Sequence, residues 1–402
     1  MKKSLVALAA LAATSAFAQF SIDGLMDVGY GTVNYKDTTA SGVINNGANT
    51  SQINFRGTEN LGGGLKASFR VETDWNTVSN KGNTGFVNAT NTTASTTAIA
   101  APVTLANANS GGGTFGNGEI RVGLEGSFGQ LHLGAPNNET LTANLTGQPF
   151  GTAIGSGFRA VSRSDAGTMG ASAVRFDNSF KYITPSVSGF KGSLVYVQKN
   201  SAPFSGTAAT SATISQAYDF TTTFGAYDYA GVQELGLHYN VGPLNAVFTN
   251  QVTDAINIAG LTGAAGETKR TLNTLGVNYT MGAFTGYLLN QSYSAKSATN
   301  AIAADTDYTA VSVKYVAGPH SLMASSGVYK LNDASAASAA YIGKKSSMTS
   351  LGYTYDLSKM TNIYARYETI NDEANAITKV ATMDVTTAGK RSRTAIGVKV
   401  GF

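Results

Sequence analysis

The sequence predicts an all-β protein, a sixteen-stranded antiparallel transmembrane β-barrel, and three observations support this. First, stretches of about ten residues that alternate between apolar and polar side chains recur from Phe20 to Phe402. Second, the connections between these stretches alternate strictly between short and long. Third, an export signal precedes them, and no later apolar run is long enough for a transmembrane helix. Outer-membrane barrels have an even number of strands, short periplasmic turns and long outer loops.

The first 18 residues are predicted to be a signal peptide. Lys2 and Lys3 supply the positive start, residues 5–13 form a short apolar segment, and the Ala16-Phe17-Ala18 tripeptide is a small-residue cleavage site. We therefore expect residues 19–402 to form the mature barrel.

Composition excludes several other classes of protein. The 402 residues include 46 Gly and 37 Tyr or Phe but no Cys, so a disulfide-stapled exported domain is excluded. The formal net charge is +4, and no basic run or basic helix is present, so we expect no nucleic-acid partner. The chain has no zinc-ligand cluster and no Gly-rich phosphate loop, and we expect no cofactor and no metal.

The strands follow from the alternation, taken in chain order. Residues 65–75 are a clear case, because Leu65, Phe69 and Val71 share one face while charged and polar residues occupy the other. Short turns contain glycine or proline, as at Gly242-Pro243, whereas the connections over residues 76–117, 200–230 and 371–388 are long. The predicted strands are residues 20–35, 51–59, 65–75, 118–128, 130–134, 174–184, 189–199, 231–241, 244–253, 270–281, 283–294, 306–317, 320–331, 347–357, 360–370 and 391–402.

One long connection, residues 135–173, differs from the others in its place along the chain. It is too long for a hairpin turn, and it lacks the apolar period of a core helix. Structureless connections of this length are usually functional or disordered. We predict that this third loop folds into the barrel mouth and narrows a water-filled channel, and the alternative is an external flap.

Fixed charge on the lumen-facing side of the strands sets which ions enter such a channel. By strand parity Arg56, Arg121 and Arg175 face the lumen near the attachment of the loop, and Arg70 shares that face. Within the loop, the charged candidates for the channel lining are Glu139, Arg159, Arg163 and Asp165.

Several motifs resemble one family, the Gram-negative general porins, and in particular its sixteen-stranded trimeric branch with anion-selective members. The motifs are SQINFRGTENLG at residues 51–62, RVGLEGSFG at 121–129, RFDNSFKY at 175–182 and a terminal Phe402 on an alternating strand. The resemblance implies an outer-membrane homotrimer, in contact with lipid and lipopolysaccharide, for passive diffusion of inorganic ions and small hydrophilic solutes. It also implies that Phe402 is the signal read by the assembly machinery.

Two positions depart from the family pattern near the expected constriction. Gly134 is followed by Ala135 where family members commonly carry arginine, and Gln148 precedes Pro149-Phe150-Gly151 where they often carry an acid. Both changes remove charge. The missing acid at Gln148 leaves the lumen arginines less opposed, whereas the missing arginine at Ala135 weakens their field, and we expect a weak to moderate preference for anions.

Two other classes of function remain as alternatives. A barrel enzyme would need a base, and only His132, His238 and His320 supply an imidazole, without a nucleophile motif beside them. A surface adhesin would use its loops, and the Thr-, Ala- and Asn-rich residues 88–110 fit such a role. We expect a non-enzymatic channel, and conductance in a planar bilayer separates it from both alternatives.

Overall fold

The computed structural model describes residues 19–35, 38–78, 115–164, 166, 174–197, 231–254, 269–296, 302–334, 336–374 and 389–402. The predicted signal peptide, residues 88–110 and Asp165 lie outside these residues. The strands are β1(Gln19–Tyr35), β2(Thr38–Asn45), β3(Gln52–Gly62), β4(Leu65–Asp74), β5(Ile120–Gly126), β6(Gly129–Ala135), β7(Ser179–Ile183), β8(Phe190–Val197), β9(Gly231–Val241), β10(Leu244–Asp254), β11(Lys269–Met281), β12(Phe284–Lys296), β13(Ile302–Ala317), β14(His320–Ala334), β15(Lys345–Asp356), β16(Thr361–Asp372) and β17(Gly389–Gly401). A helix α2(Glu139–Thr146) and a 3₁₀ turn η2(Ala336–Tyr341) complete the elements.

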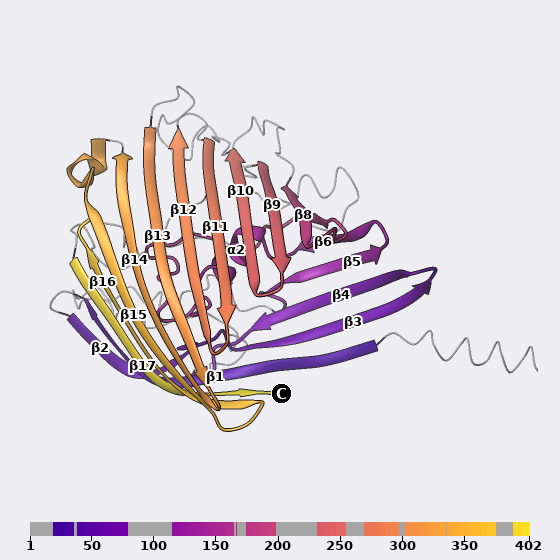
Figure 1. Cartoon of the computed structure of the whole chain (residues 1–402), viewed down its shortest axis with the longest axis horizontal. Coiled ribbons are helices and arrows are strands. Elements are labelled where there is room, and N and C mark those ends of the chain that lie inside the picture. The colour runs from indigo at the N-terminus through magenta and orange to yellow at the C-terminus, as the bar shows by residue number, and fades with distance from the viewer. Residues whose placement is uncertain are drawn as a thin grey trace, which may run out of the picture.

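The sheet closes on itself, because the last strand pairs with the first. Strand β17 runs antiparallel to β1 from Leu25↔Gly401 to Tyr35↔Arg391, and the C-terminus lies beside β1 (Figure 1). Phe402 extends this pairing, since its backbone N–H donates to the Gly24 carbonyl and its carbonyl accepts from the Gly24 N–H, both at 3.0 Å. Closure leaves no edge strand, as a membrane-spanning sheet requires. The predicted antiparallel barrel is confirmed.

The seventeen labelled strands occupy sixteen positions around the barrel. Strand β2 pairs with the part of β1 from Val28 to Tyr35, and β3 pairs with the same strand from Gln19 to Leu25. Strands β2 and β3 therefore form the two halves of a single barrel strand beside β1, and residues 46–51 leave the sheet between them. The sequence predicted the count of sixteen and strand β3, but it did not predict β2.

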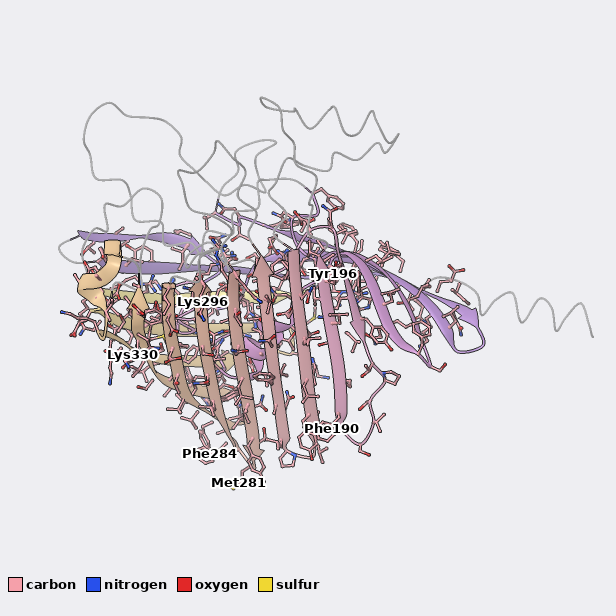
Figure 2. The ribbon with its side chains drawn as sticks, turned by 90° about the horizontal axis from the view of Figure 1, so that it is seen from above. Phe190, Tyr196, Met281, Phe284, Lys296 and Lys330 are labelled. Carbon is pink, nitrogen blue, oxygen red and sulfur yellow. The ribbon has the colours of Figure 1, made fainter. Side chains whose placement is uncertain are left out.

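The alternation divides the wall into an apolar outer face and a polar inner face. In β9, Leu235 and Leu237 are exposed on the outer face, whereas Glu234 lies on the inner face and is fully buried. Figure 2 shows Phe190, Met281 and Phe284 at the end of the wall with the short turns and Tyr196, Lys296 and Lys330 toward the other end. At the short-turn end Phe190 stacks with Tyr239, with ring centroids 4.5 Å apart, as expected for an aromatic girdle at a membrane interface.

One strand is shorter than predicted. The expected strand 174–184 is observed only as β7(Ser179–Ile183). Arg175 instead forms an isolated bridge with Asn137, so it lies beside the start of the loop and not within a wall strand.

The loop that follows β6 folds against the inner wall, and its described part, residues 136–164 with Ala166, is called the inner loop below. It contains the helix α2, which the apolar period did not predict because most of its residues are polar. Asn138 caps the helix by accepting a hydrogen bond from the Leu141 N–H, and Gly147 ends it. Among the described residues no helix is both long and apolar enough to cross a membrane.

Candidate functional site

The start of α2 is held by one carboxylate of the barrel wall. Glu234 of β9 accepts hydrogen bonds from the backbone N–H groups of Glu139 at 2.7 Å and Thr140 at 2.8 Å, and from the Thr140 hydroxyl at 2.6 Å. Gln251 of β10 donates to the same carboxylate at 3.0 Å. A carboxylate at a helix N-terminus satisfies amides that lack a partner within the helix and interacts favourably with the helix dipole. Glu234 is thus the anchor of α2.

The rest of the inner loop is fixed at three further places. Gln291 of β12 makes two hydrogen bonds with the backbone of Arg163, both at 2.8 Å. Asn278 of β11 donates to the Thr146 carbonyl at 2.9 Å. Glu368 of β16 accepts from the backbone N–H groups of Gly155 and Gly157, both at 3.1 Å. The loop therefore crosses the interior from β9 to β16.

A glycine of the wall lets α2 approach closely. A Cβ atom at Gly276 of β11 would lie 1.8 Å from the Ala143 carbonyl oxygen, far inside van der Waals contact. Gly147 meets the same strand, with its ideal Cβ 3.0 Å from the Gly276 Cα. Figure 1 shows α2 against strands β9–β11, as these contacts require.

Glu139 points from α2 to the wall and is buried. Its carboxylate accepts from Lys181 Nζ at 2.6 Å and lies 2.8 Å from His238 Nε2. Burial by itself raises the pKa of Glu139, but the hydrogen bond from His238 and the Lys181 ammonium outweigh it, and the pKa falls to about 2. Glu139, predicted as a channel-lining acid, is thus a third tie between α2 and the wall.

The four arginines predicted on the lumen face lie in one array of ion pairs on the wall from β1 to β7. Arg56 pairs with Asp23 at 2.8 Å, and Arg121 pairs with Glu119 at 3.2 Å. Arg70 bridges Glu72 and Glu119, while Arg175 reaches Asp74 at 3.3 Å and Glu72 at 3.8 Å. The structure thus brings Arg56, Arg70, Arg121 and Arg175 together with four carboxylates, so the array carries no formal surplus of charge.

The wall at β16 and β17 has a different charge balance. Arg391 and Arg393 both bind the single carboxylate of Glu368, at 2.9 and 2.8 Å. Arg366 of β16 is buried without a carboxylate within 4.0 Å among the described residues; it donates to the Tyr353 carbonyl at 3.0 Å and lies over the Phe150 ring. Lys399 of β17 lies in register between two carboxylates, Asp27 of β1 and, across β16, Asp356 of β15. Of the arginines on this wall, Arg366 is therefore the one set apart by having no carboxylate close by among the described residues.

The remaining loop candidates lie in different surroundings. Arg159 is partly exposed, and its guanidinium lies 5.4 Å from the centre of the Phe158 ring. Arg163 is buried and stacks on Tyr293 of β12, 3.7 Å from the ring centre. Gln148, which stands where the family often has an acid, closes a turn within the loop, since its side chain bonds to the Phe150 N–H and the Gly151 carbonyl.

By strand parity Glu234, Glu368 and Arg366 also lie on the lumen face, but none of them is among the site residues predicted from the sequence. The one carboxylate in the sequence of β9 was the available signal for Glu234. Its partner could not be found this way, because the loop backbone that it binds is 95 residues distant in the chain.

Comparison with known proteins gives consistent matches over the whole chain. The family model described as Gram-negative porin matches residues 4–375. The outer membrane porin protein 32 of Delftia acidovorans is 28% identical over 418 residues, covering 100% of this chain and 99% of that protein. An outer membrane porin protein of Bordetella pertussis is 26% identical and covers 91% of this chain and 93% of its own length.

Solved structures agree on the fold. The anion-selective porin from Comamonas acidovorans superposes with a TM-score of 0.68 at 22% identity and covers 96% of this chain and 100% of that one. Outer-membrane expressed OmpT of Vibrio cholerae gives a TM-score of 0.60 at 12% identity, over 96% and 98% of the two chains. Both likenesses extend over nearly the full length of the barrel.

Proposed function

The chain belongs to the Gram-negative porin family, and from that premise we propose that it is a passive diffusion channel for inorganic ions and small hydrophilic solutes, constricted by the inner loop and weakly anion-selective. It is an outer-membrane porin, a β-barrel channel and not an enzyme. The constriction is the part of this proposal that the loop contacts support, because the loop is tied to β9, β11, β12 and β16 across the interior.

The observation that carries the anion preference is the charge balance of the two walls. The array from β1 to β7 pairs four arginines with four carboxylates, and an ion of either sign finds a partner there. On the wall at β16 and β17, Arg366 has no carboxylate within 4.0 Å among the described residues. One cation without an ion-pair partner favours anions weakly, and the anion-selective porin of like fold supports the same sign.

The assembly that we propose is a homotrimer in contact with outer-membrane lipid and lipopolysaccharide. An aromatic cluster on the outer face of β1, β3 and β4 supports a contact with another copy, since Phe20 lies 6.5 Å from both Phe55 and Phe69, measured between ring centres. Phe20 is mostly exposed in the single chain. In a subunit interface these rings could pack against rings of a second copy, and the other strands would remain in contact with lipid.

The sign of the preference is tested by the zero-current potential in a KCl gradient. A unit charge about 8 Å from the ion path changes an ion's energy by about 0.5 kcal/mol in water, with opposite sign for K⁺ and Cl⁻. Removing one cation therefore lowers the chloride-to-potassium permeability ratio roughly two- to fivefold. We expect this shift for Arg366→Met. Arg56→Gln with Arg121→Gln removes two cations, so it should shift the potential further in the same direction, and it leaves Asp23 without its arginine partner.

Arg366→Lys is the matched control, because it keeps the charge and should keep the potential of the parent. A parent channel that prefers potassium would contradict the proposed sign. If the zero-current potential were unchanged in both charge-removing variants, these arginines would not determine the ion selectivity.

A further inference from the structure

A second segment enters the barrel interior opposite the anchored helix. Residues 46–51, called the inner turn below, connect β2 to β3 and belong to neither strand. On the side of β1 that faces β2 and β3, Met26 and Asp27 have no strand partner, because β2 pairs up to Val28 and β3 pairs up to Leu25. The chain therefore leaves the sheet halfway along β1. Asn46 has φ of 60°, a left-handed conformation that asparagine tolerates better than most residues.

Packing places this turn on the inner side of the wall. Ile44 and Ala48 form a buried cluster with Tyr364 of β16, Ala395 of β17 and Ile154 of the inner loop. Val43, the next residue along β2 from Ile44, is exposed on the outer face. Because Ile154 belongs to the inner loop, the inner turn and that loop share one buried cluster inside the barrel.

One carboxylate holds the turn in place. Asp27 of β1 is fully buried and accepts from the backbone N–H groups of Ala48 at 2.7 Å and Asn49 at 2.6 Å, and from the Tyr364 hydroxyl at 2.5 Å. Ser51 reinforces this, since its Oγ accepts from the Asp27 N–H at 2.9 Å. The arrangement repeats that at Glu234 and Glu368, where a wall carboxylate also binds backbone N–H groups of an inward segment.

Glycine and a polar tip complete the turn. A Cβ at Gly47 would lie 2.4 Å from the Tyr364 hydroxyl oxygen, so the turn reaches this depth only with glycine there. Asn49 is partly exposed, and its side-chain oxygen accepts from Lys399 Nζ of β17 at 3.1 Å. Asn49 and Lys399 therefore give the turn a polar surface beside strands β16 and β17.

We propose that the inner turn is a second constricting element of the channel, that it seats the tip of the inner loop through Ile154, and that Asp27 is its positioning residue. The lumen is then narrowed from two sides, with Asn49 and Lys399 in contact with passing solute. This inference uses the channel function of the family and is independent of the sign of ion selectivity.

The test uses the absence of cysteine from the chain. Single variants Asn49→Cys and Val43→Cys are labelled in detergent with a bulky neutral thiol reagent, and intact mass confirms labelling before reconstitution into planar bilayers. We expect the label at position 49 to reduce the single-channel current and the label at position 43, on the outer face of the adjoining strand β2, to leave it unchanged. Equal currents for labelled and unlabelled Asn49→Cys would overturn the proposal.

A second measurement tests the role of Asp27. Asp27→Asn removes the charge that holds the two backbone N–H groups, and we expect a higher single-channel current and entry of larger sugars in liposome swelling. Asp177→Asn, the same change at an exposed position just before β7, is the control and should behave as the parent. If Asp27→Asn folds and keeps the current and sugar cut-off of the parent, Asp27 does not position a constriction; if it does not fold, the labelling experiment decides.

Discussion

Replacing Glu234 by glutamine tests whether wall carboxylates keep the inner loop in position. Glutamine preserves the size of the side chain, but its amide NH₂ takes the place of one carboxylate oxygen. At least one of the two backbone N–H groups at the start of α2 then loses its acceptor. A hydrogen bond to a charged group contributes about 1.5–3 kcal/mol, and the charge at the helix N-terminus adds about 0.3–1 kcal/mol.

Together these losses amount to about 3 kcal/mol, which raises the ratio of detached to docked α2 roughly 10²-fold. The tip of the loop keeps its contacts with Glu368, so we expect intermittent detachment of the helix and not release of the whole loop. In single-channel recordings this change should produce added current fluctuations toward higher conductance. Glu125→Gln is the matched control, because Glu125 also faces the lumen, and among the described residues it bonds to Ser68 and lies near His132 but holds no backbone of the inner loop.

The reasoning would be refuted if Glu234→Gln, verified by mass and by the heat-shifted mobility of a folded barrel, gave the same conductance and noise as Glu125→Gln. That result would mean that the hydrogen bonds at Gln291, Asn278 and Glu368 fix α2 without the anchor at its N-terminus.

Three further predictions concern other contacts of the barrel. Gly276→Val should push α2 off β11 and lower the thermal unfolding midpoint, whereas Gly286→Val on β12, where a Cβ has open space, should change it little; equal midpoints would contradict the close approach. Since the pKa of Glu139 falls to about 2 from an ordinary 4.5, its pairing stabilises the fold fully above about pH 4.5, and this stabilisation is lost as the pH falls through about 2. Glu139→Gln should therefore flatten the acid dependence of the unfolding midpoint. An unaltered pH profile in this variant would contradict the role of the pairing. Deleting Phe402 should lower the outer-membrane yield of heat-modifiable protein, because its backbone joins the ends of the barrel at Gly24, and an undiminished yield would exclude an assembly role.

The sequence alone determined the barrel and the side of the wall on which each strand residue lies. Alternation with period two is a local property, so Leu235 and Leu237 could be placed outside and Glu234 inside without knowledge of any partner. The closing pair of strands followed from the even count, and β17 does meet β1. The position of Arg56, Arg70 and Arg121 on the inner face followed in the same way.

Only the tertiary structure decided what the inward segments do. Helix α2 has too few apolar residues to be predicted from its own period, and it forms where Glu234 binds its first amides. The same holds for the inner turn on Asp27 and for the loop tip on Glu368, which lies 213 residues from Gly155 in the chain. These segments are held by backbone N–H groups, which every residue except proline carries, so side-chain identity in the segment gives no sign of where it will dock. The sequence shows the charge of each arginine, but it does not show which carboxylate pairs with it, because that depends on which strands become neighbours.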